Sequence, residues 1–185
     1  MSNTTSLTNK NVAMLATDGF EQSELLEPQD SLKSRGANVH VISINNSDTI
    51  RAWDQKDWGK TVKVDKQIDQ VDVSDYDAVV IPGGQINPDI LRTNKKVVEF
   101  ISAANNQEKT KAIAAICHGP WLLAEANIIK DKHATSYPSI STDLKNAGAI
   151  WQDQAVVVDG KLITSRNPDD IPDFVDAIAQ KLIYA

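Results

Sequence analysis

Short apolar runs alternate with amphipathic segments along most of the chain. Four runs have the length and composition of buried strands: NVAMLA (11–16), ANVHVISI (37–44), YDAVVIP (76–82) and KAIAAI (111–116). Segments with helical spacing of apolar residues lie between them, at 25–36 and 94–107. Strands that alternate with helices predict βαβ units and a mainly parallel sheet covered on both faces. We therefore expect a three-layer α/β sandwich.

The remaining segments extend this pattern. We predict a helix after Gly119, a short strand near 133–136, a helix at 141–148, a hairpin at 155–165 and a helix after Asp169. Residues 45–70 are polar and irregular, although KTVKVD alternates as a hairpin strand does. We expect that segment, which carries Trp53 and Trp58, to leave the main sheet. The whole is predicted to be one domain over 11–185, after a polar tail over 1–10.

Composition narrows the range of partners. With 185 residues, of which 41% are hydrophobic and 24% charged, the chain can bury the core of one globular domain. A formal charge of -6 with scattered lysines provides no broad basic surface, which argues against nucleic acid as a partner. A single cysteine and a polar start without a secretory apolar region predict a cytoplasmic protein. No apolar run approaches the roughly 20 residues that cross a bilayer, so we expect no membrane partner.

Candidate functional residues follow the ends of the predicted strands. In parallel sheets of this kind, functional groups lie at the carboxyl ends of the strands. Four stretches fall there: TDGFEQSE (17–24), PGGQINPD (82–89), CHGPW (117–121) and TSRNPDD (164–170). The third holds the single cysteine, Cys117, between a buried strand and a turn in which Gly119 and Pro120 precede a helix. That arrangement resembles a nucleophile elbow, and a helix N-terminus favours a thiolate. We expect a reactive Cys117 with a lowered pKa; the alternative is a small buried apolar residue.

A cysteine nucleophile needs a base, and the chain has three histidines. His40 alternates within a predicted strand and His133 lies beside lysines, so His118 is the better candidate. A carboxylate from elsewhere must then orient its imidazole. Asp89 is the candidate for that role, although an acid at a helix start can also just complement the helix dipole.

Two glycines and two glutamates complete the candidate site. Gly83 and Gly84 allow backbone N–H groups to point into a site, so the Gly84 amide is a candidate oxyanion donor together with the His118 amide. Glu24 or Glu21 is expected to tune the Cys117 thiol. Dispersed histidines and one cysteine make a zinc site improbable, and the predicted chemistry requires neither a metal nor a cofactor.

Several of these stretches together resemble one known family. The segments that carry the resemblance are GFEQSELLEP, VVIPGGQINPDILR, AAICHGPWLLAEA, ATSYPSISTDLKNAGA and VVVDGKLITSRNPDDIPDF. From about residue 11 to the C-terminus they are similar to the PfpI family, the protease-like and general-stress-protein branch of the class I glutamine-amidotransferase-like superfamily. The resemblance implies a flavodoxin-like sandwich with Cys117 as the elbow nucleophile and His118 as its partner.

The resemblance also implies roles for other residues. Glu24 matches the family glutamate that contacts the cysteine, and Gly84, Glu21 and Tyr137 are expected at the oxyanion or substrate-binding positions. Asp89 matches an acid that completes the triad from a neighbouring subunit, which places the active site at the interface of a dimer or hexamer. This chain departs from the archaeal protease form, which has Glu at this position and one residue fewer between the double glycine and the acid.

Family members are described as deglycases, cofactor-independent glyoxalases, cysteine peptidases, and redox sensors or stress chaperones. One thiol, one imidazole and backbone donors suffice to form and rearrange a hemithioacetal. Peptide hydrolysis asks more, because a poor leaving group must be protonated and an extended chain must be held. We therefore expect a hydrolase of reactive carbonyls or of their adducts on proteins and peptides. A cysteine peptidase and a non-catalytic redox sensor or chaperone are the alternatives.

Overall fold

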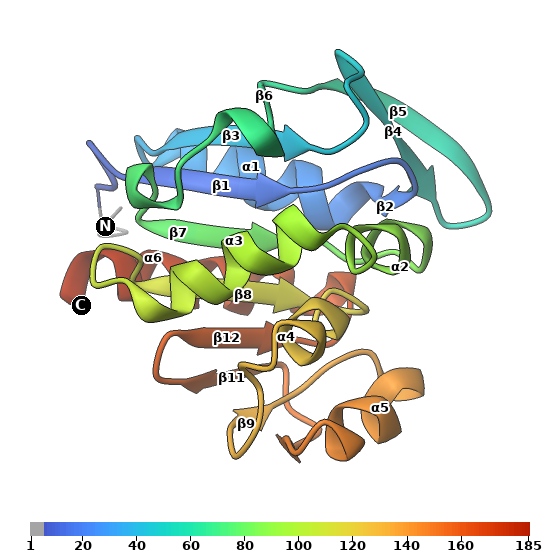
Figure 1. Ribbon diagram of the computed structural model, residues 1–185, viewed down its shortest axis with the longest axis vertical. Coiled ribbons are helices and arrows are strands. Elements are labelled where there is room, and N and C mark those ends of the chain that lie inside the picture. Colours follow the sequence, from blue (N-terminus) through green and yellow to red (C-terminus); the bar gives the residue numbers. More distant parts are fainter. Residues whose placement is uncertain (1–5) are drawn as a thin grey trace.

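A seven-stranded sheet forms the centre of the molecule (Figure 1). The structure is a computed structural model, and it describes residues 6–185. The strands lie in the order β11-β12-β8-β7-β1-β3-β6, and every neighbouring pair is parallel except β11 and β12. Their bounds are β1 (Asn11–Leu15), β3 (Asn38–Ser43), β6 (Lys66–Gln67), β7 (Ala78–Ile81), β8 (Ala112–Ile116), β11 (Val156–Asp159) and β12 (Leu162–Ser165). The predicted strands and the hairpin at 155–165 are confirmed.

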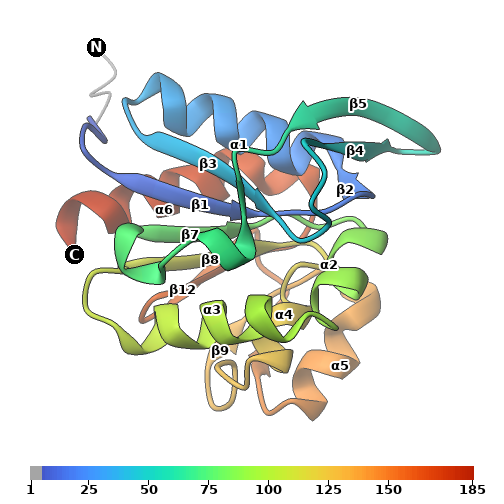
Figure 2. The same ribbon diagram turned by 45° about the horizontal axis from the view of Figure 1, so that its top comes forward.

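Helices cover both faces of this sheet (Figure 2). On one face lie α1 (Gln22–Ser34) and α6 (Ile171–Tyr184); on the other lie α3 (Lys95–Asn106) and α4 (Trp121–Glu125), with α5 (Ser141–Asn146) beyond them. Side chains of β1 alternate between two cores: Val12 and Met14 pack on the side of α1 and α6, and Ala13 and Leu15 on the side of α3. The fold is the predicted flavodoxin-like three-layer sandwich.

Two small sheets extend from the main one. The strands β4 (Thr49–Asp54) and β5 (Asp57–Lys63) form an antiparallel hairpin, which β2 (Phe20–Glu21) joins in parallel through β4. This hairpin stands beside the carboxyl ends of the main strands (Figure 1). It is the predicted excursion, although β6 returns to the main sheet within residues 45–70. The second sheet pairs β9 (His133–Ala134) with β10 (Ile150–Trp151).

Several short elements differ from the sequence-based expectation. Helix α1 begins at Gln22, three residues before the apolar spacing that predicted it, and so places Glu24 in its first turn. Helix α2 (Ile86–Leu91) is too short to show a period, and only its N-cap residue, Gln85, separates it from the double glycine. Single 3-10 turns occupy η1 (Ile68–Gln70), η2 (Val73–Asp75), η3 (Pro138–Ile140) and η4 (Pro168–Asp170).

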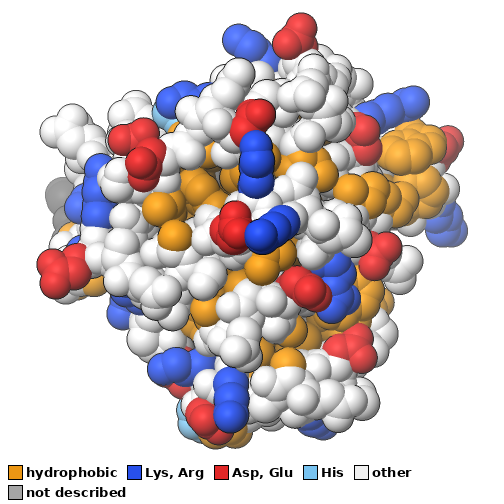
Figure 3. Space-filling view, in the orientation of Figure 1, with side chains coloured by type: hydrophobic (Ala, Val, Ile, Leu, Met, Phe, Trp, Pro, Cys, Tyr) orange, Lys and Arg blue, Asp and Glu red, His pale blue; other side chains and the backbone are white. Residues whose placement is uncertain are grey.

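The predicted N-terminal tail, residues 1–10, lies partly outside the described residues. Within it, Leu7 is fully buried and its amide donates to the Arg35 carbonyl at 2.7 Å. Over residues 6–185, no helix combines the length and apolar character needed to cross a bilayer. Figure 3 shows basic and acidic side chains interspersed over one face, without a broad basic patch on that face.

Candidate active site

Cys117 follows the last residue of β8 at a sharp turn into α4. Its φ of +63° lies in the left-handed region, which a non-glycine residue adopts at some energetic cost. The Cys117 amide donates to the Ser165 carbonyl of the neighbouring strand at 3.0 Å, and its carbonyl accepts from the Tyr137 amide at 2.8 Å. A Cβ on Gly119 would lie 2.8 Å from the Ile81 carbonyl oxygen, so the turn has room for glycine alone. The predicted strand-turn-helix elbow is present.

The imidazole of His118 lies against the thiol. Its Nδ1 is 3.1 Å from Cys117 Sγ, and its Nε2 is 3.4 Å from the hydroxyl of Ser139. The ring stacks on Tyr137 with centroids 4.9 Å apart and meets Trp121 edge-on at 5.2 Å. Burial lowers the pKa of His118, so the imidazole is neutral at pH 7 and its unprotonated nitrogen can accept a proton.

Glu24 comes to the same point from the first turn of α1. It is fully buried, and its Oε2 accepts from the Gly83 amide at 2.7 Å. Its carboxyl also lies within hydrogen-bonding reach of the Cys117 thiol. Burial raises the pKa of Glu24 to about 8, because the donated Gly83 hydrogen bond only partly offsets the loss of hydration. The carboxyl is therefore mostly protonated at neutral pH.

Burial raises the pKa of the Cys117 thiol, and the negative charge of an ionised Glu24 raises it further. The backbone N–H groups of Gly84 and His118 donate toward the sulfur and partly counter this. The expectation of a lowered pKa is therefore wrong for this chain. The reason is that α4 is a helix of five residues with a small dipole, while the thiol is 7% exposed beside a carboxyl group.

The loop between β7 and α2 places the Gly84 amide. Gly84 has a φ of +79°, and a Cβ there would lie 2.4 Å from the Gly19 carbonyl oxygen. The fully buried Asn87 ties this loop to the end of β1: its Oδ1 accepts from the Thr17 amide at 2.8 Å, and its Nδ2 donates to the carbonyls of Pro82 at 2.9 Å and Gly83 at 3.3 Å. One buried amide side chain thus positions a backbone donor of the site.

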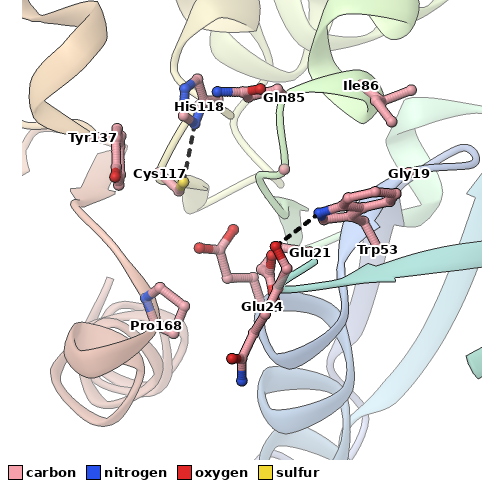
Figure 4. A pocket seen from close by; sticks show the side chains of 12 residues that line it. Gly19, Glu21, Glu24, Trp53, Gln85, Ile86, Cys117, His118, Tyr137 and Pro168 are labelled. Carbon is pink, nitrogen blue, oxygen red and sulfur yellow. Dashed lines mark hydrogen bonds between the residues drawn. The ribbon is translucent and has the colours of Figure 1, made fainter. Parts of the chain in front are cut away.

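These groups line a cavity of about 360 Å³ (Figure 4). The lining comes from the β1–α1 connection and the first turn of α1, the β4–β5 hairpin, the start of α2, the elbow, the segment after β9 and the segment after β12. It consists of Gly19, Glu21, Glu24, Trp53, Gln55, Gly84, Gln85, Ile86, Cys117, His118, Tyr137 and Pro168. Six of the seven predicted site residues are therefore together. The seventh, Asp89, is exposed on α2 and does not line the cavity of its own chain.

Sequence reasoning missed several residues of this site. Trp53 and Gln55 enter the cavity because the hairpin lies beside the elbow, and no local pattern indicates that contact. Pro168 belongs to TSRNPDD, one of the four strand-end stretches, so its position gave a usable signal. Ser139, the intrachain neighbour of His118 Nε2, lies 21 residues farther along the chain. Within residues 6–185, no group of three or more potential ligands could hold a metal ion.

Comparisons with known proteins identify the family of this chain. The sequence pattern of the DJ-1/PfpI family matches residues 10–181. The chain is 41% identical over 167 residues to Protein/nucleic acid deglycase 2 of Escherichia coli, which covers 90% of this chain and 94% of the relative. It is 42% identical over 166 residues to General stress protein 18 of Bacillus subtilis, a match that covers 89% of this chain and 93% of that relative.

A solved structure gives the same result for the fold. A two-domain protein from Anabaena variabilis, with dj-1/thij/pfpi-like and ferritin-like domains, superimposes with a TM-score of 0.86 at 39% identity. The match covers 95% of this chain and 48% of that one. The resemblance seen in the sequence is confirmed, and the chain belongs to the DJ-1/PfpI family.

Proposed function

We propose that this protein is a cysteine-dependent hydrolase of reactive carbonyls, such as methylglyoxal, and of their adducts on proteins. The 3.1 Å approach of Cys117 Sγ to His118 Nδ1 inside a cavity of about 360 Å³ carries the proposal. A thiol beside a neutral imidazole can add to an aldehyde carbon with no cofactor. Relatives named as deglycases support this assignment.

The first step joins the Cys117 sulfur to the aldehyde carbon. As the C–S bond forms, the carbonyl electron pair moves onto the oxygen, and the thiol proton passes to His118 Nδ1. Proton transfer during attack suits a thiol whose pKa is raised, because no free thiolate has to accumulate. The Gly84 and His118 amides, which already face the sulfur, stabilise the oxyanion until His118 returns the proton to it.

The hemithioacetal of methylglyoxal then rearranges within the cavity. His118 removes the proton from the former aldehyde carbon and delivers it to the former ketone carbon. The hydroxyl proton of the hemithioacetal moves to the former ketone oxygen, and a thioester remains on Cys117. Water attacks the thioester, the C–S bond breaks, and the thiol regains its proton as lactate departs. The aldehyde carbon is oxidised and the ketone carbon is reduced, so no external oxidant or reductant is needed.

An adduct on a protein enters by the same route. The sulfur displaces the protein amine or thiol from the carbinol carbon, and the thiol proton reaches the leaving group through His118. The product is the same hemithioacetal. In this proposal Asp89 of a second copy orients His118, as the family resemblance implies.

The decisive experiment assays purified protein against methylglyoxal, a methylglyoxal-modified thiol and an unfolded protein. We expect lactate from the first two substrates and none from Cys117→Ala. Cleavage of the unfolded protein without lactate formation would favour the peptidase alternative. Equal behaviour of wild type and Cys117→Ala toward methylglyoxal would reject the proposal in favour of a non-catalytic role.

A further inference from the structure

The β4–β5 hairpin adds one aromatic side chain to the wall of the cavity around Cys117. Trp53, near the end of β4, lines this cavity together with Tyr137, and Figure 4 shows the two rings on opposite sides of it. Trp53 is half-buried, whereas Trp58 of the same hairpin is 42% exposed and does not line the cavity. The acid–base steps at Cys117 and His118 make no use of Trp53, so a different role has to account for its position in the wall.

The indole of Trp53 presents apolar surface to a ligand. Its Nε1 donates to the Gln55 carbonyl at 3.2 Å, so its one hydrogen-bond donor is used within the hairpin. Trp58 meets the ring edge-on, with centroids 5.6 Å apart and ring planes at 81°. The Arg51 guanidinium in turn lies over the Trp58 ring, 5.8 Å from its centroid. These contacts hold the indole in one orientation.

Hydrogen bonds fix the hairpin to the β1–α1 connection and to α1. The Arg51 amide donates to Asp18 Oδ1 at 2.7 Å. The Gln22 side chain, at the start of α1, accepts from the Lys60 amide at 2.7 Å and donates to Asp54 Oδ2 at 3.1 Å. Because the same connection and helix also contribute to the cavity lining, the fold sets the position of the indole relative to the thiol before a ligand binds.

The cavity has room for a substrate larger than methylglyoxal. Its volume is about 360 Å³, and one water molecule in the liquid takes up about 30 Å³. Its apolar wall consists of Trp53, Ile86, Tyr137 and Pro168. Aromatic side chains bury a large area and attract a second ring edge-on or in an offset stack, so this wall suits a flat apolar group. A single methyl group buries little of such a surface.

We propose that Trp53 is a specificity-determining residue, whose indole binds the substituent of the carbonyl substrate while the aldehyde carbon lies at Cys117. This inference rests on the proposed function and specifies its substrate: 2-oxoaldehydes with an aromatic substituent, such as phenylglyoxal, are favoured over methylglyoxal. The steps at the thiol are the same for both. The aldehyde carbon of phenylglyoxal is oxidised, its ketone carbon is reduced, one water is consumed and mandelate leaves.

The test compares kcat/KM for phenylglyoxal and methylglyoxal, with mandelate and lactate as the measured products. We expect a wild-type ratio of roughly tenfold or more in favour of phenylglyoxal, because additional apolar groups bound in a pocket raise kcat/KM. Trp53→Leu should lower this ratio several-fold, and Trp53→Phe, which keeps a flat ring, should retain most of it. Tyr184→Leu, at an 80% exposed position outside the cavity, should keep the wild-type ratio. The two aldehydes differ in intrinsic reactivity by the same factor for every variant, so a change in the ratio reports on the residue at position 53.

Competition against methylglyoxal tests the same contact without a variant. Acetophenone carries the ring and the ketone of phenylglyoxal but no aldehyde, so it should inhibit wild-type turnover competitively, with a Ki roughly tenfold or more below that of acetone. A wild-type preference for methylglyoxal, a ratio that Trp53→Leu does not change, or equal Ki values for the two ketones would overturn the inference alone. Absence of turnover of both aldehydes, or turnover that Cys117→Ala retains, would overturn the proposed function, and this inference with it.

Discussion

At the scale of single residues, the site depends on a carboxyl group held where water cannot reach it. Glu24 is fully buried, accepts a hydrogen bond from the Gly83 amide and interacts with the Cys117 thiol. A protonated Glu24 places no negative charge beside Cys117, whereas an ionised one opposes thiolate formation. The protonation state of Glu24 therefore controls both the stability of the fold and the acidity of the nucleophile.

The first prediction concerns stability. The folded pKa of Glu24, about 8, lies above its ordinary value of 4.5. The protonated Glu24 contributes fully to the free energy of unfolding below pH 4.5. This contribution is lost as the pH rises toward 8, because the unfolded chain releases the proton at a lower pH than the folded chain. Urea unfolding should show a free energy that declines over this window by up to about 1.4 kcal/mol per pH unit. Glu24→Gln should make the free energy of unfolding less dependent on pH over this window, whereas Glu99→Gln, at an exposed position, should leave the dependence unchanged. Parallel curves for wild type and Glu24→Gln would contradict this account.

The second prediction concerns the thiol. Because the chain has one cysteine, iodoacetamide alkylation reports on Cys117 alone. Its rate should rise with pH to an inflection above the roughly 8.5 of a free cysteine. Glu24→Gln should move that inflection to lower pH, since it removes the carboxylate charge. A wild-type inflection below 8 would instead support the activated thiol that the sequence alone suggests.

At the scale of elements, the loop between β7 and α2 holds the Gly84 amide in position. Asn87→Ala removes three hydrogen bonds and leaves the buried Thr17 amide unpaired, so we expect a loss of about 1–3 kcal/mol in unfolding free energy. Turnover should fall up to about 100-fold, mainly in kcat, as the oxyanion donor moves. Urea unfolding and steady-state kinetics on methylglyoxal measure both effects.

Asn94 provides a matched control in the next helix. Its side chain caps α3 by accepting from the Lys96 and Val97 amides, away from the cavity. Asn94→Ala should cost about 1 kcal/mol and leave kcat unchanged. If both variants lost stability and neither lost kcat, Asn87 would be a structural residue only.

At the scale of the whole molecule, one ring nitrogen of His118 has only a weak hydrogen-bond partner within the described chain. Its Nε2 has the Ser139 hydroxyl at 3.4 Å, a long hydrogen bond, and no carboxylate of the described chain pairs with it. Asp89 is exposed on α2, where a second copy could present it. Exposed apolar side chains flank it on the same helix: Ile86 is 37% exposed and Ile90 40%. These features favour completion of the site by self-association.

The corresponding prediction is that Asp89→Asn keeps the assembly and lowers turnover by a factor on the order of 10 to 10⁴. Asp89→Glu should also lower it, because the longer side chain overfills a gap to which the extra loop residue is adapted. Light scattering and kinetics on the same samples provide the measurement. If Asp89→Asn turned over within twofold of wild type and lost about 0.3 to 1 kcal/mol in unfolding free energy, Asp89 would only stabilise the N-terminus of α2 through the helix dipole.

The succession of the main strands and helices along the chain, and the nature of the elbow, follow from local sequence patterns. Strand and helix periods are local, so runs such as KAIAAI indicate their structure without knowledge of the rest. The position of Cys117 between a buried strand and Gly119 is local in the same way. For parallel strands, the shared carboxyl edge then brought Glu24, Gly84 and Cys117 into one predicted site.

The tertiary structure decided what surrounds that thiol and how it titrates. Trp53 and Gln55 line the cavity because the β4–β5 hairpin packs beside the elbow, and only the folded chain sets such a contact. The pKa of Cys117 rises because desolvation depends on every group packed around the sulfur, which no local spacing records. Proximity between distant segments and exclusion of water are properties of the folded chain as a whole.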